Sequence, residues 1–149
     1  MGRLPGDPAA LPDAAKKAAT TFERALQDPN SDVREAAAIA LMRLHPTHSV
    51  PALIAALKDK EPLVSGRAAS ALAQIGKPAI PALVRALDDP DHEMRRGAAY
   101  ALGRIGPAAK PASKRLQEMA RSQDPLVRLV AIRALRRIDP QALPTAPAH

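Results

Sequence analysis

Cysteine, tryptophan and long apolar runs are missing from this sequence, and aromatic residues are nearly absent. The 149 residues include no Cys and no Trp, one Phe and one Tyr. Without cysteine, the chain can have no disulfide framework, no thiol catalysis and no thiolate metal site. No apolar run approaches about 18 residues, so the sequence predicts no membrane-spanning helix. The first residues lack the apolar stretch of a secretory signal, and we expect a cytoplasmic protein.

Small and aliphatic residues dominate instead. The chain contains 33 Ala and 17 Leu. Alanine favours helices, and its small side chain lets neighbouring helices approach closely. The length suits a single domain. These features predict an all-α domain with a core built from Ala and Leu.

A repeat runs through the sequence. One Leu position recurs at Leu41, Leu72, Leu102 and Leu135, spaced by 31, 30 and 33 residues. The segments around these leucines align without gaps and carry an apolar stripe of helical period. They cover residues 33–45, 64–76, 94–106 and 127–139. Related segments precede them at 13–28, 49–59, 79–89 and 112–124.

Helix-breaking residues separate these segments. Asp-Pro or Glu-Pro dipeptides divide the first segment of each pair from the second, and Gly76 and Gly106 follow second segments as helix-ending residues. We therefore predict eight helices in four antiparallel pairs. One pair cannot bury its apolar stripe alone, so the pairs should stack into a right-handed α-solenoid over residues 12–139. We expect residues 1–11 and the Pro/Ala-rich tail 140–149 to be disordered.

The second segments follow the pattern D-x-x-V-R-x-x-A-A-x-A-L-x-x-I-G. This pattern resembles HEAT-like repeats, in particular the short bacterial kind named after the phycobilin lyases. The resemblance covers about residues 12–139 and implies the solenoid fold. Proteins with repeats of this kind serve as scaffolds, lyase subunits, hydroxylases and DNA-repair enzymes. The fold alone therefore does not indicate which of these functions this chain has. The pattern's Arg is replaced by Ser65 in the second pair; if this Arg forms the polar ladder between repeats that is typical of the family, one rung is missing there.

Charge is the strongest functional signal. The chain carries 22 basic and 15 acidic residues, a net charge of +7. In HEAT-like solenoids the second helix of each pair lines the concave side, and the columns there that are not used for packing hold six Arg and one acid. The residues that we predict to contact a partner are Arg43, Arg67, Arg96, Tyr100, Arg104, Arg133 and Arg137. Arginine binds carboxylates and phosphates in a bidentate manner, which suits an anionic partner.

Other interpretations of this face stay open. Long Arg side chains also cover apolar surface, and a charged face is usually only a solvated one. Arg136, one column away from Arg137, is expected at the rim of the face. Leu129 and Val130 occupy otherwise polar columns, where they either receive a tail residue such as Leu143 or anchor a partner.

No catalytic, cofactor-binding or metal site is predicted. His45 and His48 are separated by Pro46 and have no third ligand nearby, so we expect two solvated loop histidines. Asp32, Asp91 and Glu93 are expected to cap helix N-termini. We predict a monomeric, non-enzymatic interaction module that binds an acidic protein or peptide. Nucleic-acid binding through the same face is the alternative, and a lyase-type or other enzyme subunit is the second alternative.

Overall fold

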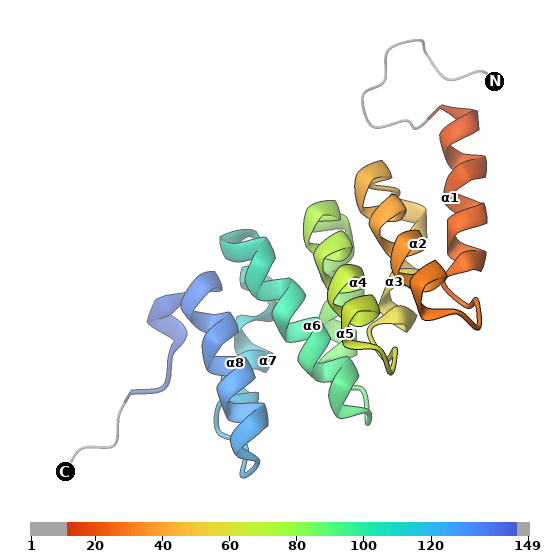
Figure 1. Ribbon diagram of the computed structural model, residues 1–149. Helices are drawn as coiled ribbons and strands as arrows, with labels where there is room; N and C mark the ends of the chain where they lie inside the picture. Colours follow the sequence, from red (N-terminus) through yellow and green to blue (C-terminus); the bar gives the residue numbers. More distant parts are fainter. Residues whose placement is uncertain (1–11, 146–149) are drawn as a thin grey trace.

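The computed structural model describes residues 12–145, and within them the chain is helical and contains no strand. Four pairs of antiparallel α-helices stack side by side into an elongated solenoid (Figure 1). The first helices of the pairs are α1 (Asp13–Ala25), α3 (Val50–Ala56), α5 (Ile80–Ala86) and α7 (Ser113–Met119). The second helices are α2 (Ser31–Leu44), α4 (Pro62–Ile75), α6 (His92–Ile105) and α8 (Pro125–Ile138). The predicted four helix pairs are thus confirmed.

Short 3₁₀ helices connect one pair to the next. They are η1 (Thr47–Ser49), η2 (Lys77–Ala79) and η3 (Gly106–Ala112), and η4 (Pro140–Ala142) follows α8. Before η1 and η2 the backbone adopts a positive φ, at His45 (50°) and at Gly76 (76°). This left-handed conformation favours glycine, so the second of these turns has the residue that such a turn normally requires.

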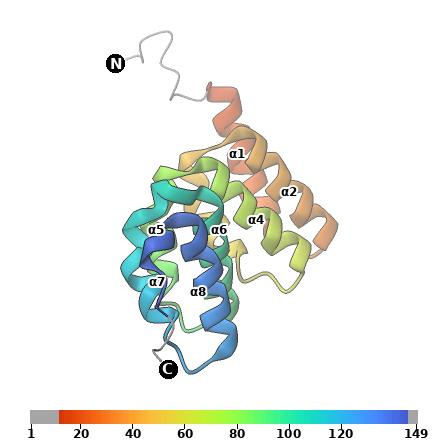
Figure 2. The same ribbon diagram turned by 90° about the vertical axis from the view of Figure 1, so that its left-hand side faces the viewer.

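The second helices form a continuous layer. Neighbouring members α2, α4, α6 and α8 pack directly on one another, and each first helix packs on its own partner (Figure 1). Figure 2, which views the stack from its α7–α8 end, shows the two layers side by side. One face of the molecule is therefore built from second helices alone.

Alanine and leucine make the core, as their abundance predicts. The recurring leucine of each second helix is fully buried, and the same helices bury a column of alanines. Small side chains at these contacts let the helix axes come close, so no aromatic residue is needed to fill the space between them. The members of this alanine column are Ala37, Ala68, Ala98 and Ala131.

The described start of the tail is folded. Residues Pro140–Ala142 form η4, and the backbone carbonyl of Ala142 accepts a hydrogen bond of 2.9 Å from Gln117 Nε2. Leu143 packs against the core. The disorder expected from residue 140 onward therefore does not hold for 140–143. This turn is similar in sequence to η2, in that Ala142 and Leu143 occupy the positions of Ala79 and Ile80. The predicted disorder of 1–11 and of 146–149 lies outside the described residues.

Candidate functional site

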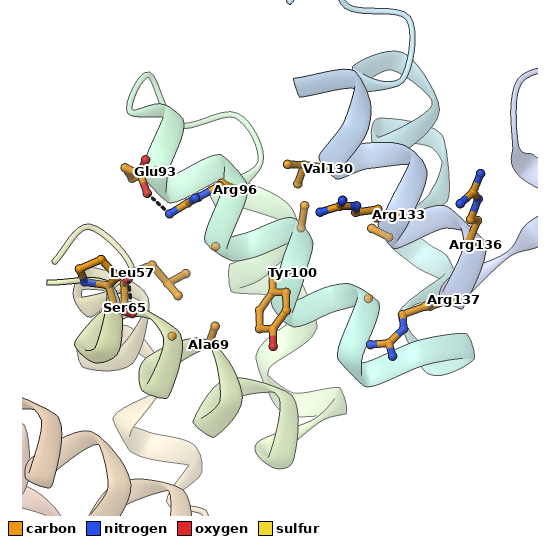
Figure 3. Close-up of a pocket in the computed structure, with 16 residues that line it drawn as sticks. Leu57, Ser65, Ala69, Glu93, Arg96, Tyr100, Val130, Arg133, Arg136 and Arg137 are labelled. Atoms are coloured by element: carbon orange, nitrogen blue, oxygen red, sulfur yellow. Dashed lines mark hydrogen bonds and ion pairs between the residues drawn. The ribbon is translucent and has the colours of Figure 1, made fainter. Parts of the chain in front are cut away.

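A groove with a volume of about 650 Å³ crosses the second-helix face over α4, α6 and α8 (Figure 3). Its floor is made of glycine and alanine. Gly66 and Ala69 come from α4, Gly97 and Gly103 from α6, and Ala134 from α8. Small residues therefore shape a shallow apolar surface across three consecutive repeats.

An added Cβ atom would make close contacts at two of these floor positions. A Cβ atom at Gly103 would lie 3.3 Å from the Ala134 Cα, and one at Gly97 would lie 3.1 Å from the Leu57 Cδ2. Gly66 differs, since a Cβ there would have no heavy atom within 4 Å. Two glycines thus permit close helix packing, and the third leaves open space in the groove.

The structure brings together four of the seven predicted partner-binding residues. Arg96, Tyr100, Arg133 and Arg137 line the groove. Arg104 lies next to it, in a smaller hollow that Tyr100 and Arg137 also line. The predicted set is therefore centred on α6 and α8.

The two remaining predicted residues, Arg43 and Arg67, do not line the groove. Arg67 instead donates to Glu35 of α2, with 3.2 Å between Nε and Oε1. Arg136, which was expected at the rim, is among the lining residues, although its side chain points outward in Figure 3. The predicted residues that line the groove therefore all come from α6 and α8.

Glu93 is the lining residue that sequence reasoning missed. Its Oε2 accepts a hydrogen bond of 2.6 Å from Arg96 Nη2, at the edge of the groove (Figure 3). The signal was available, because acid and base three residues apart lie on the same side of a helix. We had assigned Glu93 only to the helix N-terminus, where it does stand, in the first turn of α6.

A cap fixes the position of Glu93. Asp91 is the N-cap of α6, and its Oδ1 accepts from the backbone N–H groups of Met94 (3.3 Å) and Glu93 (2.8 Å). These two hydrogen bonds, the Met94 bond foremost, lower the pKa of the Asp91 carboxyl below its ordinary value. The capping prediction is thus confirmed for Asp91. Asp32 does lie in the first turn of α2, as expected, but the N-cap of that helix is Asn30, which accepts from the Asp32 N–H.

The α8 arginines that line the groove differ from Arg96 of α6, which pairs with Glu93. Within residues 12–145, no carboxylate lies within ion-pair distance of Arg133, Arg136 or Arg137. Arg104 donates to Tyr100 Oη at 3.4 Å, and its guanidinium lies 5.9 Å from the centre of the Tyr100 ring. This is the geometry of a cation–π contact.

Leu129 and Val130 occupy two different environments on α8. Val130 lines the groove, whereas Leu129 is 43% exposed. Leu143 of the tail packs against the core, yet Leu129 keeps this exposure. Val130 is therefore the one of the two that contributes apolar surface to the groove.

The described residues show no other chemical centre. No three His, Asp or Glu side chains in 12–145 are grouped so that they could hold a metal ion. His45 Nε2 lies 2.8 Å from Gln74 Oε1, and His48 Nε2 lies 3.5 Å from Glu23. Among the helices of this part of the chain, none is long and apolar enough to cross a membrane.

Stacked antiparallel helix pairs with a continuous second-helix face define an α-solenoid repeat protein. A family model described as HEAT repeats matches residues 18–103 and 50–136. The chain belongs to the HEAT-repeat family, which confirms the resemblance found in the sequence.

Three solved structures to which the chain is similar are engineered proteins. Three crystal structures match with sequence identities of 24%, 28% and 22% and TM-scores of 0.46, 0.44 and 0.47. The alignments cover 85%, 87% and 89% of this chain and 62%, 41% and 67% of the engineered chains. A comparison with curated proteins finds no significant match.

Proposed function

We propose that the groove across α4, α6 and α8 binds an acidic segment of a partner protein. HEAT repeats typically serve as scaffolds for protein interactions, and an acidic segment is the kind of ligand that this groove fits best. The observation that carries it is the α8 wall. Arg133 and Arg137 line the groove there without a carboxylate partner in the described residues.

The composition of the groove favours a peptide over a purely ionic ligand. Interaction surfaces typically combine an apolar centre with a polar rim, and arginine is enriched in them. Here the glycine and alanine floor together with Val130 supplies the apolar part, and the arginines supply the rim. Tyr100, which is 49% exposed, stands in the middle of the groove (Figure 3). A segment with both acidic and apolar side chains matches both parts.

Selection from a displayed random-peptide library tests this proposal. We expect the wild-type protein to enrich peptides with Asp or Glu next to apolar residues, and the double variant Arg133→Gln/Arg137→Gln to lose that enrichment. Arg43→Gln is the matched control, because Arg43 occupies the position of Arg137 in the first repeat but lies outside the groove. No enrichment, or the same enrichment by both proteins, would contradict the proposal.

Nucleic-acid binding is the second candidate, and the net charge of +7 favours it. Fluorescence anisotropy with labelled single- and double-stranded DNA distinguishes it from peptide binding. On duplex DNA, log K should fall by about 0.9 for each unit of log salt per phosphate contacted, so affinity should drop steeply between about 50 and 200 mM salt. Binding with this slope that Arg133→Gln/Arg137→Gln abolishes would support a phosphate-binding face. No binding at the lower salt concentration would exclude this function.

A further inference from the structure

The charge of the groove is graded along its length. Its α4 wall is formed by Pro62, Ser65, Gly66 and Ala69, and no charged residue of α4 is among the described lining residues. Arg67 belongs to α4 as well, but it pairs with Glu35 on the α2 side. The α4 end of the groove is therefore uncharged.

The middle wall is electrically balanced. Glu93 and Arg96 of α6 both line the groove and are paired at 2.6 Å. Figure 3 places this pair on the side of the groove that faces Leu57 and Ser65, away from the α8 arginines. An acidic side chain that entered here would meet the carboxylate of Glu93 as well as the guanidinium of Arg96. The pair therefore offers no net attraction for acids.

The α8 wall carries all of the uncompensated charge. Arg133, Arg136 and Arg137 line this end without a carboxylate within ion-pair distance in residues 12–145. The α4 end of the groove is apolar and open, since the exposed Pro62 lines it and a Cβ at Gly66 would meet no heavy atom within 4 Å. The two ends thus present different chemistry to a ligand that spans them.

We infer that the groove binds a bipartite protein segment in one orientation, with an apolar end over α4 and an acidic end against α8. Glu93 determines this specificity, because it neutralises Arg96 and so leaves the α4 half without net attraction for an acidic side chain. The inference rests on the proposed function and adds to it the order of the partner's side chains. Complementary charges fix the register of such a complex more than they add affinity.

Two synthetic peptides of identical composition test the order. The bipartite peptide Ac-LLAAEEEE-NH2 keeps its acids together, and the mixed peptide Ac-ELAELEAE-NH2 spreads them along its length. We expect the wild-type protein to bind the bipartite peptide up to about fivefold more tightly, the upper end of what one exposed charge contact contributes. Glu93→Gln should remove most of this preference by improving the binding of the mixed peptide.

Labelling shows the orientation directly. The chain has no native Cys, so a spin label on Leu63→Cys or on Leu126→Cys is unique. These two exposed leucines occupy the same register position in α4 and α8. A label at Leu63→Cys should broaden the leucine methyl signals of the bound bipartite peptide, and one at Leu126→Cys its glutamate signals.

The outcomes separate this inference from the proposed function. If both peptides bind equally, if Glu93→Gln leaves the preference unchanged, or if the labels show the reverse orientation, the graded groove is wrong while acidic-segment binding stands. If neither peptide binds and the peptide library yields no acidic sequences, both fall together. Arg43→Gln should leave both peptide affinities unchanged, since it removes one positive charge outside the groove.

Discussion

Arg34 and Asp59 form a two-point ion pair that joins the first helix pair to the second. Arg34 Nε lies 2.8 Å from Oδ2 of Asp59, and Nη2 lies 3.2 Å from Oδ1. Both side chains are buried to about nine-tenths. Arg34 also donates from Nη1 to the carbonyl oxygens of Asp28 (2.9 Å) and Pro29 (3.1 Å). The guanidinium of Arg34 thus binds both the loop of the first helix pair and a carboxylate of the second helix pair.

The first prediction compares Arg34 with Arg95. Arg95 makes the same carbonyl contacts, to Asp89 at 2.7 Å and Pro90 at 2.9 Å, but forms no ion pair with any residue in 12–145. Both Arg34→Gln and Arg95→Gln should lower the melting temperature, and Arg34→Gln should lower it more because it leaves Asp59 without its partner. Thermal unfolding followed by circular dichroism measures both. Equal losses would mean that the ion pair adds nothing to the loop contacts.

The second prediction concerns pH. Partial burial acts to raise the pKa of Asp59, but the hydrogen bonds from Arg34 and from the Glu61 N–H outweigh it and hold this pKa below its ordinary value. A carboxyl whose pKa is lowered by folding stabilises the protein above its unfolded-state pKa of about 3.9, and this contribution disappears as pH falls through the folded-state pKa.

Denaturant unfolding between neutral and acidic pH measures this contribution. Asp59→Asn should be less stable than wild type at neutral pH, and the difference should shrink as the pH falls below about 4. In an Arg34→Gln background the pH dependence of this difference should be weaker, since the principal hydrogen bond to Asp59 is gone. A difference between wild type and Asp59→Asn that is constant over this range would contradict the prediction.

The Arg column shows how far the sequence could lead. The repeat pattern predicted the helix pairs because each local signal (apolar stripe, Pro break, Gly end) acts within one helix. The resemblance to HEAT-like repeats raised the question whether the Arg column forms a polar ladder between repeats. In the structure, Arg34, Arg95 and Arg128 each bind the loop carbonyls of their own pair, and only Arg34 reaches a neighbour's carboxylate. The second pair does lack this contact, since Ser65 donates to Pro62 instead.

The candidate site was less predictable than the fold. The position of a residue in the repeat indicates the helix face to which it belongs. It does not indicate which carboxylate the guanidinium of a long arginine side chain will contact. Arg67 turns to Glu35 and Arg96 turns to Glu93, so among the arginines that line the groove only those of α8 have no carboxylate partner in residues 12–145. The groove itself depends on Gly97 and Gly103, whose lack of a side chain matters only once the neighbouring helices are in place.

The third prediction concerns the tail. A chain that ends at Asp139 loses the hydrogen bond from Gln117 to Ala142 and the packing of Leu143 against the core. Removing a partly buried leucine of this kind should lower the free energy of unfolding by about 1–2 kcal/mol. Urea unfolding measures the loss.

A double-mutant cycle connects this loss to the contact itself. Gln117→Ala should alter the stability of the full chain differently from that of the shortened chain, because the side chain and the carbonyl of Ala142 interact directly. Additive effects, or a shortened chain as stable as the full one, would show that the folded start of the tail adds nothing to the stability of the solenoid.

The fourth prediction uses the two kinds of glycine in the groove. Glycine inside a helix costs about 0.5–1 kcal/mol relative to alanine, chiefly because the unfolded chain has more freedom to lose. Gly66 lies within α4, where an added Cβ would have no heavy atom within 4 Å. Gly66→Ala should therefore raise the free energy of unfolding by about that amount, without change in the urea dependence.

Gly103→Ala tests the opposite case. Its Cβ would lie 3.3 Å from the Cα of Ala134, so the backbone of α8 must move to accept it, unlike a flexible side chain that can rotate away. The helix-propensity gain should be cancelled or reversed, and the difference between the two variants isolates the cost of separating α6 from α8. If Gly103→Ala stabilised the protein as much as Gly66→Ala does, the close approach of these helices would not depend on glycine. The floor of the groove would then tolerate larger side chains.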